Sequence, residues 1–242
     1  MNYDTVIIGS GYFSAGYALS HKNTLVIEET QLLDPNFCGR LLGFDMICER
    51  PEGGDAAALF DAFFKEELIG DGRLSVNELE PAFCRFLEGR GLDFLLGTVC
   101  TDIEKTEGGY KLEICNNEGV SDIFAKKVID TRVPLGNQMI LLVELNDGVY
   151  PKLDGVRPAF DKNQCIIPIE FEGVTDHNEA KSLALKKCVD ALAEVGARII
   201  LTSYRMCGTP IKEAYTDEEG ILHVDERAFG DIFGAYAKGG SL

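Results

Sequence analysis

The hydrophobic pattern at the start of the chain predicts a β-turn-α-turn-β unit. An apolar run covers 4–8, a turn with glycines follows, 12–21 has helical spacing, and a second apolar run covers 24–29. The next segment, 30–54, is rich in Pro and Gly. It predicts a long irregular loop over the surface or over a ligand.

Two amphipathic helices, at 55–68 and from Ser75 onward, precede a stretch in which the hydrophobic period changes to two. A strand at 94–104, a turn, a second alternating strand and a third that ends in VIDT predict an antiparallel meander.

The rest of the chain predicts a second, smaller unit. Apolar runs at 138–145 and 165–171 indicate two strands, and an amphipathic helix covers 178–194. A further strand is expected at 198–204. Together, the first two strands and the helix predict a small sheet with a covering helix.

Composition and charge narrow the class of partner. The chain has 242 residues with 40 Asp and Glu against 23 Lys and Arg, a formal charge of −17. So acidic a surface repels nucleic acid and anionic lipid, so neither nucleic acid nor a membrane is expected as a partner. No apolar run reaches the ~18 residues of a membrane span, so we expect a cytoplasmic protein. The eight cysteines include no CxxC pair, which favours reduced thiols.

The string VIIGSGYFSAGYA carries the strongest chemical signal. Gly9 permits a tight turn, and Gly11 lets the backbone approach a pyrophosphate at the start of the helix. Small residues at Ser14 and Ala18 permit close packing of the helix on the sheet. Glu28 ends the second strand, where a carboxylate accepts hydrogen bonds from ribose hydroxyls. A carboxylate there also repels a 2′-phosphate, which disfavours NADP. The alternative is a glycine turn of an unrelated α/β protein.

Three ordered segments resemble the FAD-dependent oxidoreductases of glutathione-reductase type, a superfamily of flavoproteins with two dinucleotide-binding folds. The first is GSGYFSAGYA with Glu28, similar to the family's ADP-binding fingerprint. The second is AKKVIDTR, in which Thr131 is central to a segment similar to the family's apolar-Ala-Thr-Gly. The third ends in YAKGG, similar to the family's Tyr-Ala-x-Gly-Asp, with Gly240 where the family's Asp binds the ribityl chain. Gly39 and Arg40 are similar to a weaker motif of amine-oxidase-like members, in which they approach the diphosphate.

The resemblance implies an α/β fold class: a Rossmann-like FAD/NAD(P)-binding domain, with a parallel sheet and a crossover β-meander, plus a smaller α+β substrate-type domain. The FAD-binding domain would comprise 1–134 and 196–242, and the inserted domain 135–195. The cofactor would be FAD and the substrate a small organic molecule. The expected cofactor contacts are Gly9, Gly11, Tyr12, Phe13, Ser14, Glu28, Glu29, Gly39, Arg40, Val99, Thr131, Gly239 and Gly240.

Catalytic residues are not predicted by the sequence, and no metal-ligand spacing is present. Cys38 is either a reactive thiol beside the cofactor or an ordinary buried one. Tyr204 and Arg205 either face a bound ring or an anionic substrate, or belong to a self-packed loop. His177 is either an acid or base, or an exposed residue at a helix start.

Three functional hypotheses follow. The first is an FAD-dependent oxidoreductase that acts through non-covalent flavin. The second is a non-catalytic relative that has lost stable flavin binding. The third keeps the enzyme but expects a partner chain, identical or different, to complete the site, because the family continues beyond the position of Leu242.

Overall fold

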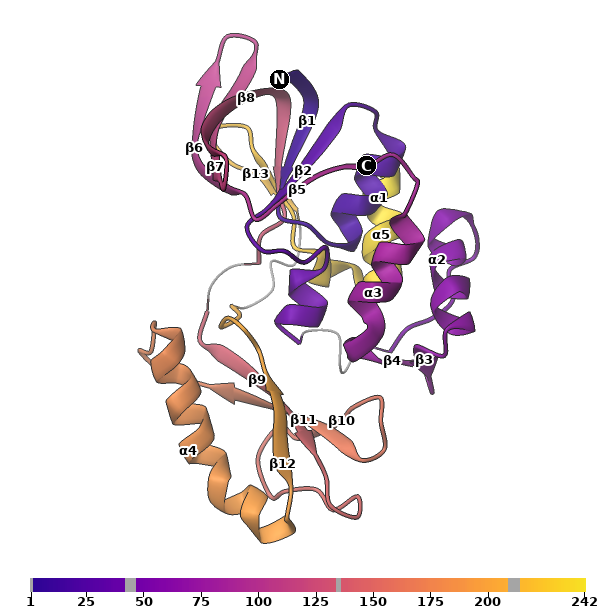
Figure 1. The fold of residues 1–242 in the computed structure, drawn as a ribbon, viewed down its shortest axis with the longest axis vertical. Helices are drawn as coiled ribbons and strands as arrows, with labels where there is room; N and C mark the ends of the chain where they lie inside the picture. The colour runs from indigo at the N-terminus through magenta and orange to yellow at the C-terminus, as the bar shows by residue number, and fades with distance from the viewer. Residues whose placement is uncertain (1, 42–46, 134–135, 209–213) are drawn as a thin grey trace.

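A computed structural model describes residues 2–41, 47–133, 136–208 and 214–242. The chain forms two units, each with its own sheet (Figure 1). The expected boundary between residues 134 and 135 lies outside the described residues.

The larger sheet is built around parallel strands. Its order is β13 (Tyr215–Thr216), β14 (Leu222–His223), β8 (Gly119–Asp130), β1 (Asn2–Ile8), β2 (Thr24–Glu28) and β5 (Asp93–Leu96). Every pair from β14 to β5 is parallel. The expected meander consists of β6 (Val99–Thr106), β7 (Gly109–Asn116) and β8, and the far end of β8 enters the parallel sheet beside β1.

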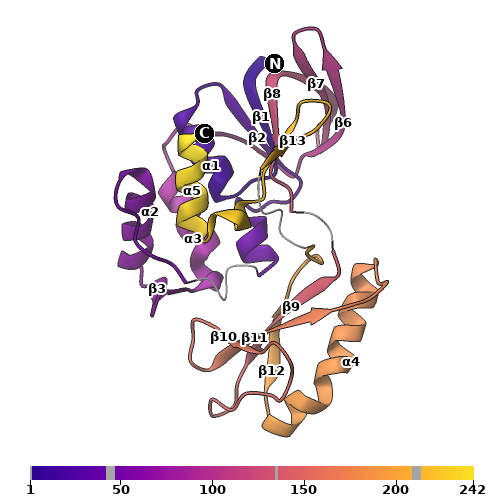
Figure 2. The same cartoon turned by 180° about the vertical axis from the view of Figure 1, so that it is seen from behind.

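Both faces of this sheet are buried, which explains why its central strands are continuous apolar runs rather than alternating ones. Ile7, Val26 and Ile129 point into a core shared with helices. Their neighbours Val6 and Ile27 point into a second core shared with the meander. The helices and the meander therefore lie on opposite faces of the sheet, as the two views show (Figures 1 and 2).

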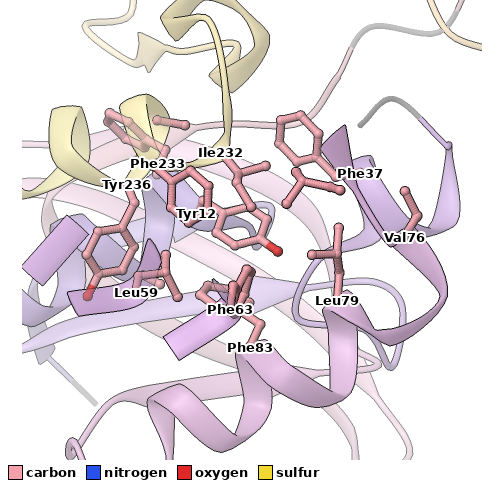
Figure 3. Packing of buried hydrophobic residues seen from close by; sticks show 14 of the residues in the cluster. Tyr12, Phe37, Leu59, Phe63, Val76, Leu79, Phe83, Ile232, Phe233 and Tyr236 are labelled. Carbon is pink, nitrogen blue, oxygen red and sulfur yellow. The ribbon is translucent and has the colours of Figure 1, made fainter. Parts of the chain in front are cut away.

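Four helices cover the first face: α1 (Tyr12–Ser20), α2 (Gly54–Lys65), α3 (Val76–Leu87) and α5 (Ile232–Ser241). Short elements β3 (Ile69–Gly70) and β4 (Arg73–Leu74) connect α2 to α3, and a π-helical turn, η1 (Pro35–Gly39), precedes them. The Tyr12 ring lies among the rings of Phe37, Phe63 and Phe83 (Figure 3). The start of α1 is therefore fixed in the core by its own first side chain.

The smaller unit has an antiparallel sheet in the order β10 (Arg157–Pro158), β11 (Gln164–Glu170), β9 (Gln138–Glu144) and β12 (Arg198–Thr202). The long helix α4 (His177–Val195) packs on one face of this sheet. The strands and helix match the expected ones, but the expected end of the inserted domain at residue 195 does not. The expected division places 198–202 in the larger domain, whereas β12 pairs with β9 and completes the smaller sheet.

The C-terminal segment also differs from expectation. A 3₁₀ turn, η2 (Glu226–Phe229), follows β14, and the YAKGG string lies inside α5. Gly239 packs where α5 crosses α1: a Cβ at Gly239 would overlap the carbonyl oxygen of Phe13. Gly239 thus permits close packing of the two helices. Both Gly239 and Gly240 lie in α5 rather than at the turn between β1 and α1, and their expected cofactor contacts stay predictions.

Candidate functional site

The turn between β1 and α1 is fixed by Gly9. Its φ is +101°, in the region that favours glycine, and a Cβ there would lie 2.7 Å from the Thr131 hydroxyl. The Gly9 carbonyl oxygen accepts hydrogen bonds from the hydroxyls of Thr131 (2.7 Å) and Ser14 (2.8 Å). Two of the segments singled out in the sequence are therefore in direct contact, at the carboxyl ends of neighbouring strands.

Glu28 lies at the carboxyl end of β2 and is only 4% exposed. Its carboxylate accepts hydrogen bonds from the backbone amides of Ser10 (3.0 Å) and Thr30 (2.8 Å). These bonds hold the carboxylate at the edge of the sheet beside the Gly9 turn. This is the position that the sequence predicts for a ribose-binding acid.

A cavity opens at this edge, and we refer to it as the β1–β2 cleft. It is lined by residues that include Gly9, Ser10, Glu28, Glu29, Asn36, Arg40, Val99, Arg132 and Tyr204. The cavity volume is about 30 Å³, room for about one or two water molecules. The cleft thus brings together residues that follow the neighbouring strands β1, β2 and β8. A nucleotide would have to open the cleft further.

Arg40 reaches the cleft from the loop after η1. Its side chain is buried, and Nη1 donates to the Val133 carbonyl oxygen at 3.1 Å. Among the described residues its buried Nε has no hydrogen-bond partner. A buried donor without a partner is costly, so this Nε could donate to an acceptor in the cleft.

Tyr204, from the loop after β12, lines the cleft, and Arg205 follows it in the same loop. The Tyr204 amide donates to the Gly39 carbonyl oxygen at 3.0 Å, and a Cβ on Gly39 would lie 2.7 Å from the Tyr204 ring. Gly39 therefore makes room for this ring. Arg205 forms an ion pair with Glu29. Of the two readings of this loop, the one that places it at a binding site agrees with Tyr204 lining the cleft.

The start of α1 holds a carboxylate of the chain itself, that of Glu226 from η2. Its Oε2 accepts a hydrogen bond from the Phe13 amide at 3.3 Å, and its Oε1 accepts one from the Asn36 side-chain amide at 2.7 Å. A Cβ on Gly11 would overlap both carboxylate oxygens. The close backbone approach that Gly11 permits is thus used by Glu226.

Burial raises the pKa of Glu226 to about 7, against the hydrogen bonds that favour its charged form. Burial and the nearby Glu226 also raise the pKa of Asp34 well above its usual range. Asp34 caps η1 by accepting from the Phe37 amide at 2.9 Å. The region around the start of α1 therefore contains two buried carboxyl groups.

Other expected residues lie elsewhere. The side chains of Tyr12 and Phe13 point into the helical core rather than into the cleft, so only their backbone faces Glu226. Burial raises the pKa of Cys38 well above that of an ordinary thiol, which argues against a reactive thiolate. His177 begins α4 of the smaller unit, whereas Glu28 lies in the larger unit, and burial lowers the pKa of His177.

Two further findings concern only the described residues. Within 2–41, 47–133, 136–208 and 214–242, no three His, Cys, Asp or Glu side chains gather as metal ligands would. No helix of those ranges has the length and apolar character that a bilayer crossing needs.

Comparison with known proteins shows the fold. No protein-family model matches the sequence, and no curated protein matches it. Among solved structures, an anhydrotetracycline hydroxylase from Streptomyces rimosus aligns with a TM-score of 0.62 at 14% identity, over 99% of this chain and 62% of that chain. A flavoprotein/dehydrogenase from Cytophaga hutchinsonii aligns with a TM-score of 0.60 at 14% identity, over 99% and 76%.

A glycerol-3-phosphate dehydrogenase from Bacillus halodurans, solved in complex with FAD, aligns with a TM-score of 0.57 at 13% identity, over 98% of this chain and 63% of that chain. The chain therefore shares its fold with these proteins, which confirms the predicted fold class of a Rossmann-like domain plus a smaller one. The finer resemblance to the glutathione-reductase type stays a prediction.

Glu226, Asn36 and Ser10 are site residues that sequence reasoning missed. Glu226 lies 213 positions from Phe13, so no local pattern joins them. A signal for Glu226 was present: an acid that begins the turn η2 shortly after a short strand, β14, that runs parallel to β8. In parallel sheets, ligand-binding residues follow the carboxyl ends of strands.

Proposed function

We propose that the chain is an FAD-dependent oxidoreductase that acts on a small organic substrate through non-covalently bound flavin. The observation that carries the proposal is the buried Glu28 carboxylate beside the Gly9 turn, at the carboxyl ends of β1 and β2. In this fold that is where a dinucleotide's ribose lies. The flavoprotein fold and the partnerless Nε of Arg40 in the same cleft support it.

The chain's residues fit FAD in part. Glu28 would hold the adenosine ribose, and Arg40 would offer a charge-assisted donor to a phosphate. The start of α1 does not fit as it stands, because Glu226 uses the Phe13 amide and fills the space beside Gly11. FAD, when bound, supplies the redox chemistry, while the protein supplies position and electrostatics.

The test is the colour of the protein. Purified without added cofactor, or after incubation with FAD and removal of the excess, the protein should absorb near ~450 nm as flavoproteins do. The Glu28→Gln variant, which loses the carboxylate that would accept ribose hydroxyl bonds, should retain less flavin. The proposal fails if the wild-type protein is colourless and also refuses added FAD.

A second candidate is a relative with this fold that does not hold flavin stably. The specific observation in its favour is Glu226 at the position of the diphosphate. Thermal unfolding with FAD, NAD or ADP decides between the two, because a ligand that binds only the native state raises the melting temperature. If no nucleotide raises it, this second candidate replaces the first.

A further inference from the structure

The carboxylate of Glu226 takes the part of a bound anion at the start of α1. Backbone amides at a helix N-terminus have no partner within the helix and attract negative charge. Here the Phe13 amide donates to Glu226, and this side chain is only 1% exposed. The chain therefore satisfies its own anion position from a residue more than two hundred positions away.

We propose that Glu226 is a built-in competitor for the diphosphate of FAD, so that FAD binds only when this carboxylate is displaced. This inference rests on the proposed function, because it concerns the same site. Two contacts of Glu226 and one electrostatic observation support it.

The first contact is with Gly11. Because a Cβ at this position would overlap both carboxylate oxygens, only glycine lets Glu226 come so close to the backbone. Glycine at this turn lets a pyrophosphate approach in dinucleotide-binding proteins. The two anions would therefore occupy the same space and cannot be present together.

The second contact is with Asn36, whose side-chain amide donates to Glu226 at 2.7 Å. Asn36 is buried and also lines the β1–β2 cleft. It stands between the cleft and Glu226, so it would be free to donate to a phosphate once the carboxylate had moved.

The third observation is electrostatic. Arg227, the cation next to Glu226, is committed to Asp225, with Nε at 2.8 Å from Oδ1, and to the Gly208 carbonyl oxygen. Arg40 instead keeps a buried Nε without a partner among the described residues, and its side chain lines the β1–β2 cleft. The cleft thus offers a donor suited to a phosphate, while the neighbouring anion position is already taken.

The test compares Glu226→Ala with the wild-type protein and with a matched control, Glu80→Ala. Glu80 is likewise a carboxyl group that accepts two hydrogen bonds, here from the backbone amides of Leu33 (2.6 Å) and Asp34 (2.8 Å) in the loop before η1 rather than from α1. Both variants remove one carboxyl group. FAD binding is measured by quenching of flavin fluorescence, and the cooperativity of thermal unfolding checks that each variant is folded.

We expect Glu226→Ala to bind FAD at least tenfold more tightly than the wild-type protein, with no such gain in Glu80→Ala. Inorganic pyrophosphate should raise the melting temperature of Glu226→Ala but not of the wild-type protein. If Glu226→Ala does not fold, Glu226→Gln removes the charge and keeps the shape, and it should show a smaller gain of the same sign.

If the wild-type protein binds FAD well and Glu226→Ala binds it equally or more weakly, the proposal that Glu226 competes with the diphosphate is overturned, and the proposed function stands. If pyrophosphate stabilises only Glu226→Ala and no variant binds FAD, Glu226 is supported as a competitor for a diphosphate, and the proposed function is defeated. If neither FAD nor pyrophosphate distinguishes Glu226→Ala from the wild-type protein, the competitor is refuted.

Discussion

The crossing of α1 and α5 allows a sharp prediction, because two neighbouring glycines of α5 meet different surroundings. In Gly239→Ala the new methyl group would overlap the Phe13 carbonyl oxygen and lie 2.8 Å from the Tyr17 amide nitrogen. These are backbone atoms of a helix, which cannot rotate away. In Gly240→Ala the nearest atom is the Ser20 hydroxyl oxygen at 3.2 Å, which can rotate.

The expected magnitudes follow from these contacts. Overpacking costs about 1–3 kcal/mol, and alanine in a helix returns about 1 kcal/mol relative to glycine. Because the clash at Gly239 is with backbone, we expect a net loss of about 2 kcal/mol for Gly239→Ala. Gly240→Ala should be neutral or more stable by about 0.5 kcal/mol. For a chain of this size, Gly239→Ala should melt about 4–8 °C lower.

The assay is thermal and urea unfolding followed by far-UV circular dichroism, with flavin binding measured on both variants. Equal stability of Gly239→Ala and the wild-type protein would refute the packing argument. So would a larger loss in Gly240→Ala than in Gly239→Ala. Reduced FAD affinity in a fully stable Gly240→Ala would instead support the cofactor contact that the family resemblance implied.

Two further predictions concern buried polar groups. Because burial raises the pKa of Glu226 from 4.5 to about 7, the folded protein binds an extra proton between these values. Its free energy of unfolding should therefore fall by about 3 kcal/mol as pH rises through this window. Measured by urea unfolding, this free energy should depend less on pH in Glu226→Gln than in the wild-type protein, and an equal dependence in the two proteins would contradict the raised pKa. The buried Tyr12 hydroxyl has no partner among the described residues, whereas Tyr110 donates to the Glu219 carbonyl oxygen. Tyr12→Phe should thus gain about 1 kcal/mol and Tyr110→Phe lose a similar amount in urea unfolding; a loss in Tyr12→Phe would refute this.

Local pattern was enough to predict the first half of the site. The turn at Gly9, the helix after it and the acid at Glu28 belong to one continuous unit, and short-range periodicity determines where each lies. The family resemblance, rather than local pattern, grouped Thr131 with Gly9 as expected cofactor contacts, and the two residues are hydrogen-bonded.

Long-range packing explains what the sequence did not reveal. The YAKGG string is similar to a family motif in sequence, but in α5 its Gly239 serves a helix crossing, and only the facing residues of α1 show this. The strand at 198–202 pairs with β9, more than fifty positions earlier, so nothing local assigns it to the smaller sheet. Glu226 likewise acquires its role only when η2 reaches α1.

A crystal structure of Glu226→Ala grown with FAD tests the central claim most directly. We predict a diphosphate hydrogen-bonded to the Phe13 amide and a ribose hydroxyl at the Glu28 carboxylate, in a β1–β2 cleft wider than that of the wild-type protein. An FAD molecule bound elsewhere, or a Phe13 amide and Glu28 carboxylate untouched by nucleotide at saturating FAD, would contradict the account.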